Sequence, residues 1–214
     1  MKKITALYIG LALLIGHTGF SQAKKSADEI LKEVTEKTKS YSSLKIDFTY
    51  NMDNPEAKIH ESEAGSLLVS GDKYRLNIAG QIIISDGETM WTYIQEVNEV
   101  QINTVEEDQE LMTPTKLLTS YSEQYKSKLA GEETKAGKTY QVIELKPNEN
   151  KTYSLVTLTV DKNEKRFVRI AIQDNNGNTF TYIVNDFIPE SPVNETDFTF
   201  SDKEFPGAEV IDMR

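Results

Sequence analysis

The sequence has no cysteine in 214 residues and very little histidine. Disulfide bonds, thiolate nucleophiles and a lipid-modified N-terminal cysteine are therefore excluded. Beyond the first 23 residues the single histidine is His60, on a polar stretch that we expect to be exposed. A histidine-based triad and a zinc site of the usual His/Cys kind lack the residues that they require. Since a glycine-rich phosphate loop is also missing, we predict no catalytic residue, no metal, no cofactor and no enzyme activity.

Long apolar runs are missing as well, except at the N-terminus. Two lysines precede an apolar run from Ile4 to Ile15, and Ser21 and Ala23 place small residues before a cleavage point. The run is too short to span a bilayer comfortably. The pattern predicts a secretory signal peptide over residues 1–23 and export of a soluble protein to the periplasm.

Positive charge is scarce relative to negative charge. The chain has 24 Lys and Arg against 34 Asp and Glu, a formal net charge of −10, and removal of the signal peptide would take away two more lysines. Such a protein avoids nucleic acid and anionic lipid surfaces. Residues 24–214 contain no repeat, low-complexity tract or linker, and their length suits a single domain.

The first segment after the predicted cleavage point has the pattern of an amphipathic helix. Ser26 and Glu29 have the spacing of a capping box. Apolar residues then follow a helical stripe at Ile30, Leu31, Val34 and Tyr41. We predict a helix over about residues 27–40.

After Leu44 the apolar period changes to two, which is typical of β-strands. Turn signals at Gly71, Gly80, Asp86-Gly87 and Val97–Glu99 divide this region into a meander. Further strands are predicted at Tyr140–Leu145, Tyr153–Val160, Phe167–Ile172 and Phe180–Phe187, and a short one at Asp197–Phe200 in an otherwise irregular tail. The sequence therefore predicts a mainly β (α+β) fold with one large, strongly curved antiparallel sheet.

A second helix is predicted between the strands, in "TPTKLLTSYSEQYKSKL". Thr113 suits an N-cap and Pro114 the first helical position. One helical face would collect Leu117, Leu118, Tyr121 and Tyr125.

The strand pattern also predicts one apolar face of the sheet. Its expected members are Phe48, Tyr50, Leu67, Val69, Tyr74, Leu76 and Ile78, extended by Ile82, Ile84, Val100 and Ile102, with Trp91 and Tyr93 sharing a face in between. Ordinary core packing explains such a face. The alternative is a half-open curved sheet that holds an apolar ligand, although the pattern alone favours core packing.

The order of these segments resembles the LolA family, the periplasmic carriers of outer-membrane lipoproteins. The matching pieces are "YSSLKIDFTY", "GSLLV", "KYRLNI", "IISDGETMWTY", "TPTKLL" and "DFTFSDKEFPGAEVIDMR". The resemblance implies an incomplete, strongly curved β-barrel whose inserted helix forms a lid over a hydrophobic cavity. It further implies a monomer that takes acylated lipoproteins from an inner-membrane ABC transporter to an outer-membrane acceptor. The acyl-chain site would then comprise Phe48, Tyr50, Leu67, Val69, Tyr74, Leu76, Ile78, Ile82, Ile84, Trp91, Tyr93, Leu117, Leu118 and Tyr121.

The sequence departs from the family at one functional position. In well-studied members an arginine beside a proline, just after the "GxLxV" strand, latches the lid. Here the stretch is Ser70-Gly71-Asp72, and Arg75 is expected on the opposite strand face from Tyr74. Other functions stay open: a carrier of another hydrophobic ligand such as a glycolipid, a lipid- or glycan-processing enzyme, or a structural β-domain with a solid core.

Overall fold

The computed structural model describes residues 25–105, 125–149 and 152–214. The predicted signal peptide and the predicted lid helix at Leu117, Leu118 and Tyr121 therefore lie outside the described residues. The elements are α1 (Ala27–Lys39), β1 (Leu44–Asn54), β2 (Ile59–Ser70), β3 (Lys73–Ile78), β4 (Gln81–Ser85), β5 (Thr89–Ile94), β6 (Glu99–Thr104), β7 (Tyr125–Lys135), β8 (Lys138–Pro147), β9 (Tyr153–Asp161), β10 (Arg166–Asp174), β11 (Thr179–Pro189), the 3₁₀ turn η1 (Glu195–Phe198) and β12 (Glu209–Asp212).

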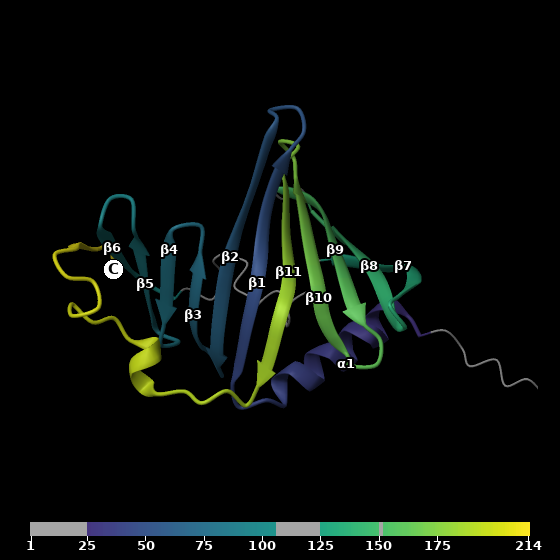
Figure 1. The fold of residues 1–214 in the computed structure, drawn as a ribbon, viewed down its shortest axis with the longest axis horizontal. Helices are drawn as coiled ribbons and strands as arrows, with labels where there is room; N and C mark the ends of the chain where they lie inside the picture. The colour runs from purple at the N-terminus through teal and green to yellow at the C-terminus, as the bar shows by residue number, and fades with distance from the viewer. Residues whose placement is uncertain (1–24, 106–124, 150–151) are drawn as a thin grey trace, which may run out of the picture.

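The strands form one open, curved sheet in the order β12-β6-β5-β4-β3-β2-β1-β11-β10-β9-β8-β7. Neighbouring strands are antiparallel except for β12, which runs parallel to β6. The sheet does not close, so β12 and β7 form its two edges (Figure 1). This confirms the predicted mainly β fold with a strongly curved antiparallel sheet.

Helix α1 begins at the predicted capping box. The backbone N–H of Glu29 donates to Ser26 Oγ (3.2 Å), and the backbone N–H of Ser26 donates to Glu29 Oε2 (2.7 Å). Two of the free N–H groups at the helix start are thereby paired. The same helix buries Leu31 and Val34 completely, so its apolar stripe fixes it against the sheet.

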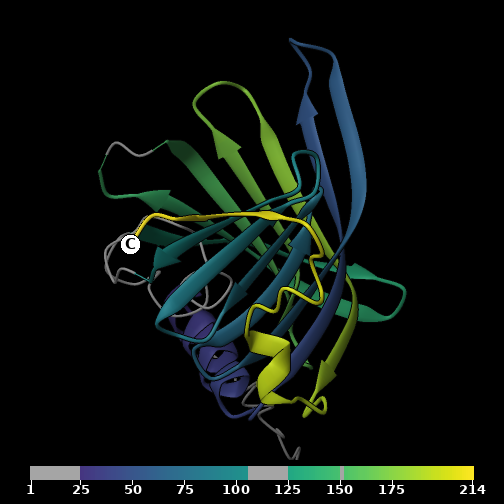
Figure 2. The ribbon, with the colours of Figure 1, turned by 90° about the vertical axis from the view of Figure 1, so that its left-hand side faces the viewer.

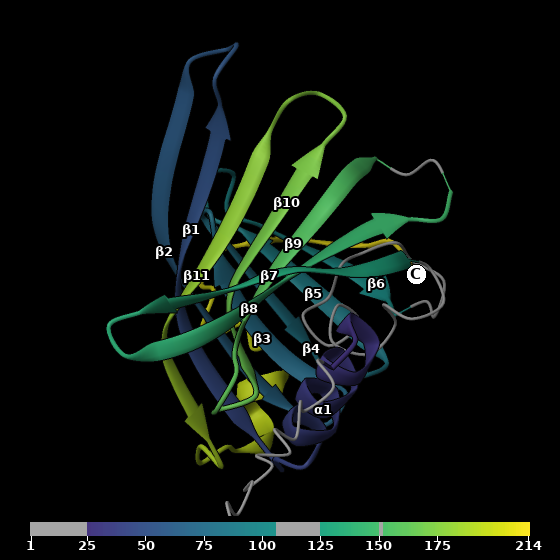
Figure 3. The same cartoon turned by 90° about the vertical axis from the view of Figure 1, so that its right-hand side faces the viewer.

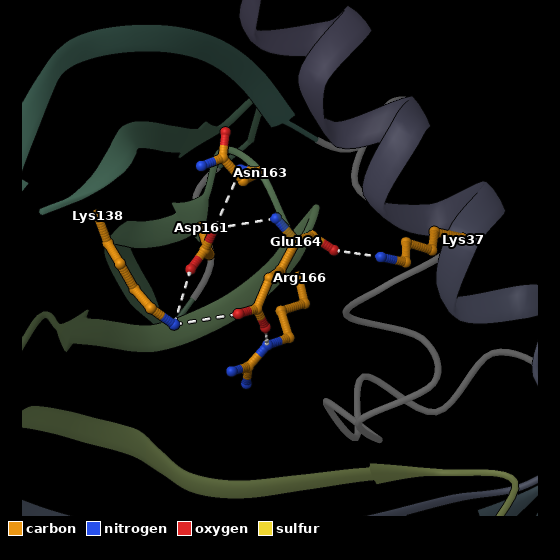
Figure 4. Close-up of polar contacts among 6 residues, drawn as sticks. All are labelled: Lys37, Lys138, Asp161, Asn163, Glu164 and Arg166. Carbon is orange, nitrogen blue, oxygen red and sulfur yellow. Dashed lines mark hydrogen bonds and ion pairs between the residues drawn. The ribbon is translucent and has the colours of Figure 1, made fainter.

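Polar contacts hold the C-terminal half of α1 on the turn between β9 and β10 (Figure 4). Lys37 Nζ donates to the carbonyl oxygen of Glu164 (2.6 Å). The turn is itself shaped by Asp161, whose carboxylate accepts the backbone N–H groups of Asn163 (3.0 Å) and Glu164 (2.9 Å). Ion pairs with Arg166 (2.5 Å) and Lys138 (3.0 Å) lower the pKa of the Glu164 carboxyl, which favours its ionised form.

Three expectations about secondary structure are wrong. Tyr125 lies in strand β7 and not on the predicted second helix, because β7 pairs with β8 along its whole length. Asp197–Phe200 is not a strand, since η1 occupies Glu195–Phe198 there. The tail beyond it is not irregular throughout, because β12 adds to the edge of β6. Long-range pairing, which local patterns do not encode, decides all three.

Candidate functional site

The candidate site is the apolar face of the sheet that carries α1, here called the inner face. Over β8–β10 this face is closed by the helix (Figure 3). The buried core there comprises Ala27, Ile30, Leu31, Val34, Ile143, Leu145, Val156, Leu158, Val160, Phe167 and Ile172. Six further apolar side chains pack against this core and are partly buried: Tyr125, Leu129, Tyr153, Ile170, Phe180 and Tyr182. Most of the apolar side chains of this half therefore lie in a packed core.

The other half of the inner face, over β1–β4, is more open. Phe48, Leu67 and Tyr74 are buried there. The remaining apolar side chains around them are only partly buried: Ile46, Tyr50, Val69, Leu76, Ile78, Ile83 and Tyr182. An apolar face with this much exposure offers a contact surface for an apolar ligand.

Tyr182 joins the two halves, since its ring packs against both clusters. Its ring centroid lies 5.4 Å from that of Tyr50 and 5.8 Å from that of Phe48. Phe180 stacks on the other side of Tyr50 at 6.4 Å. An aromatic ridge on β1 and β11 therefore separates the helix-covered core from the open half.

The register confirms that seven of the predicted site residues share the inner face. Directly opposite residues of adjacent strands point to the same side of a sheet. The pairs Leu67–Leu76 and Val69–Tyr74 join β2 to β3, and Ile46–Leu67 joins β1 to β2. The inner-face set is Phe48, Tyr50, Leu67, Val69, Tyr74, Leu76 and Ile78.

Four predicted site residues lie on the opposite, outer face: Ile82, Ile84, Trp91 and Tyr93. The expectation that they and their neighbours Val100 and Ile102 extend the inner face is wrong. Ala79 and Gly80, both with positive φ, form a two-residue turn that places Ile78 opposite Gln81. Because this turn has two residues, the inward-facing side chains are those of even-numbered residues on β3 and of odd-numbered residues on β4. Ile83, which we did not predict as a site residue, takes the inward position opposite Leu76.

The C-terminal segment, residues 199–214 after η1, covers these outer-face residues. Figure 2 shows it crossing over β3–β6 as the yellow chain. Phe205 is 6% exposed and lies 4.5 Å from the ring of Tyr93, with Phe200 stacked behind it at 5.7 Å. Asn98 fixes the end of the segment, donating from its side chain to the Gly207 carbonyl oxygen (2.9 Å) and accepting the Glu209 N–H (3.0 Å). The aromatic residues of β5 thus anchor the tail.

Arg75 also lies on the outer face and contacts the C-terminal segment. It lies opposite Leu68 and Ile84 in the register, on the other face from Tyr74, as predicted. Both of its terminal nitrogens bind the Glu204 carboxylate. Arg75 therefore ties β3 to the C-terminal segment and does not point into the inner face, where a lid latch would have to lie.

Three tyrosines of the inner face, Tyr50, Tyr74 and Tyr182, place hydroxyl groups among its apolar side chains. Burial raises the pKa of Tyr74, whose hydroxyl donates to Met90 Sδ (3.4 Å). Burial, with a smaller effect of Tyr50, raises the pKa of Tyr182 to about 12. Burial also raises the pKa of Tyr50, with further effects of Glu61 and Glu63. These hydroxyls stay protonated near neutral pH and serve as hydrogen-bond donors, not as bases.

Other kinds of site find little support in the described ranges. His60 is exposed and contacts only the side chain of Asp53 among the hydrogen bonds seen there. Within those ranges, carboxylates and histidines nowhere gather in threes in a metal-binding arrangement. No helix of the described residues is long and apolar enough to cross a bilayer.

Comparison with known proteins agrees with this architecture. The family model described as outer membrane lipoprotein carrier protein LolA matches residues 39–201. The chain belongs to the LolA family. The match runs from the end of α1 to the start of the C-terminal segment and so includes strands β1 to β11. The LolA family consists of carriers rather than enzymes.

A curated relative is the outer-membrane lipoprotein carrier protein of Psychromonas ingrahamii, 30% identical over 106 residues. The match spans 48% of this chain and 49% of that protein, about half of each. Among solved structures, an uncharacterized conserved protein from Thermus thermophilus has a TM-score of 0.56 at 14% identity, covering 87% of this chain and 98% of that one. A LolA superfamily protein from Nitrosomonas europaea has a TM-score of 0.45 at 17% identity, covering 83% and 99%. At these identities the Thermus structure supports the fold alone.

Proposed function

We propose that this protein is a periplasmic carrier that binds the acyl chains of lipoproteins on the open half of its inner face. The observation that carries the proposal is the contrast between the two halves. Under α1 most of the apolar side chains among the described residues are buried, whereas Leu76, Ile78 and Ile83 on β3 and β4 are only partly buried. A solid structural core would bury both halves to the same degree. Membership of the LolA family supports lipoproteins as the ligand.

The energetics of such a carrier favour partial burial. Each buried methylene contributes about 0.8 kcal/mol, so one acyl chain of roughly 15 methylenes would gain about 12 kcal/mol if it were buried completely. Several chains held so tightly would not dissociate on a useful timescale. A face that contacts the chains on one side binds them more weakly, and release then needs only a more favourable acceptor. The proposed partners are an inner-membrane ABC transporter as donor and an outer-membrane acceptor.

The test is a pair of matched substitutions of the same residue type on opposite faces. Leu76 lies on the inner face, so Leu76→Glu places a carboxylate against the acyl chains and should abolish saturable binding of the fluorophore phenylnaphthylamine. Leu68 lies on the outer face directly between Lys45 and Arg75. Leu68→Glu therefore gains two cationic neighbours and should leave binding within about twofold of the parent.

Competition and thermal melts complete the test. A diacylated lipopeptide should displace the fluorophore from the parent protein. A folded Leu76→Glu variant with unchanged binding would remove the inner face as the site. A Leu76→Glu variant that no longer folds, beside a parent that binds no fluorophore, would favour the solid core.

A carrier of another hydrophobic ligand, such as a glycolipid, is the alternative, because an apolar face alone does not select the group attached to the chains. Mass spectrometry of lipids and acylated proteins that copurify from exporting cells separates the two. N-terminal sequencing of the same material tests the proposed cleavage after Ala23, and its partition between the periplasmic and membrane fractions tests the proposed localisation.

A further inference from the structure

We propose that the hydroxyls of Tyr50 and Tyr182 bind the carbonyl oxygens of the ligand's acyl groups and so set how deeply each chain enters. This inference rests on the proposed function, since it assigns the polar end of a ligand whose apolar part lies on the same face. Hydrogen bonds from these two hydroxyls would make the site selective for acyl chains over plain alkyl chains.

The first argument is a polarity boundary along the inner face of β2. The inward residues of β2 are Val69, Leu67 and Gly65, followed by Glu63 opposite Tyr50 and then Glu61. On β2 the face therefore changes from apolar to anionic at the level of Tyr50, while Met52 on β1 and its partner Phe180 on β11 continue the apolar face. An amphiphile that lies along β2 would place its apolar part against Leu67 and Val69 and its polar part at the level of Tyr50.

The second argument is the position of Tyr182 at the same level. Tyr182 on β11 is the register partner of Tyr50. Their ring centroids are 5.4 Å apart with an interplanar angle of 48°, and Phe48 lies 5.8 Å from Tyr182 on the apolar side. Two tyrosine rings from adjacent strands are thus paired at this level, and together they offer two hydroxyl donors to a ligand that carries several acyl groups.

The third argument is that these two hydroxyls have unused donor capacity. Tyr74, Tyr93 and Tyr125 each direct the hydroxyl to another side chain. In the described part of the chain, the hydroxyls of Tyr50 and Tyr182 form no such bond. The raised pKa values of both keep the protons in place. A carbonyl oxygen, which only accepts, fits two such donors, whereas Glu61 and Glu63 disfavour an anionic group.

The experiment compares two ligands that differ only in the carbonyl group. Binding of a diester-linked diacylglycerol and of the diether-linked dialkylglycerol of equal chain length is measured on the mature protein by displacement of phenylnaphthylamine. The parent should prefer the diester by about fivefold, the size of a net neutral hydrogen bond. Tyr182→Phe and Tyr50→Phe should each reduce that preference and leave the diether affinity unchanged, because only a hydroxyl is removed.

Tyr140→Phe is the matched control. Its neighbour Gln141 lies opposite Val160 on the inner face, so Tyr140 points to the outer face. This variant should keep the parent's preference. Equal affinity of the parent for both ligands, or an unchanged preference in both Phe variants, would overturn the inference while the proposed carrier function stands. Failure of the parent to bind either ligand would overturn both.

Discussion

The ring of Phe48 occupies the space beside Gly65, its register partner on the neighbouring strand, where a Cβ atom would otherwise lie. A Cβ at position 65 would overlap the Cε2 and Cζ atoms of that ring and would approach the Asn77 carbonyl oxygen to 3.0 Å. Glycine at this position thus leaves room for an aromatic side chain on the inner face of β2. The Phe48 ring packs there in one buried cluster with Leu67 and Tyr74.

Substitution of this glycine tests the packing directly. Gly65→Ala should lower the free energy of unfolding by about 1–3 kcal/mol, because the Phe48 ring must leave its position in a tightly packed site. Gly131→Ala is the control, since a Cβ there meets no atom within 4 Å and the backbone φ is not positive. Urea denaturation of both variants measures the difference, and equal stability of the two would contradict the packing.

Phe205 should be the main anchor of the C-terminal segment. It is 6% exposed and packs on Tyr93, so Phe205→Ala should destabilise the protein by about 3–5 kcal/mol. Met213 is 51% exposed, and Met213→Ala should change stability by less than about 0.5 kcal/mol. Thermal melts distinguish the two. Because the segment lies on the outer face, folded Phe205→Ala protein should still bind phenylnaphthylamine, and loss of binding would place the ligand on the outer face instead.

The raised pKa of Tyr182 predicts that the protein loses stability at high pH. Burial raises the pKa of Tyr182 to about 12 in the folded protein, above the ordinary tyrosine value of 10.0. Between these pH values the unfolded chain has released the Tyr182 proton and the folded chain retains it. The contribution of Tyr182 to the free energy of unfolding is therefore complete below pH 10 and is lost as the pH rises toward 12. The effect is at most about 2–3 kcal/mol, less to the extent that the ring is exposed.

The measurement for Tyr182 is a series of melts at increasing alkaline pH. Tyr182→Phe should flatten the decline relative to the parent, whereas Tyr140→Phe should not. Superimposable profiles of the parent and Tyr182→Phe would show that the Tyr182 hydroxyl is well solvated.

The capping box at the start of α1 should contribute to stability by a smaller amount. Ser26→Ala removes the acceptor of the Glu29 N–H and should cost about 1 kcal/mol. Ser62→Ala, at an exposed strand position with no side-chain bond among the described residues, should be close to neutral. Chemical denaturation monitored by circular dichroism compares them, and a neutral Ser26→Ala would show that the tertiary packing of Leu31 and Val34 alone holds the helix.

Local pattern determined much of the fold. The spacing of Ser26 and Glu29 placed the start of α1, and alternation from Ile46 to Ile78 placed β1–β3 and their inner face. Both signals act over a few residues, through backbone capping and the two-residue period of a strand. The family resemblance read from the sequence was confirmed for the same reason, since it rests on the order of such segments.

Tertiary structure decided which face each later strand presents and what covers it. The two residues of the Ala79-Gly80 turn reversed the parity of β4, so Ile83 and not Ile84 faces inward. Trp91 and Tyr93 have the same alternation as cavity residues, yet Phe205 covers them from more than a hundred positions away in the sequence. Tyr182 meets Tyr50 only because β11 pairs with β1. The two-residue period of a strand shows only that its two faces differ. Which face is open to a ligand depends on the register of the strands and on the part of the chain that packs against each face.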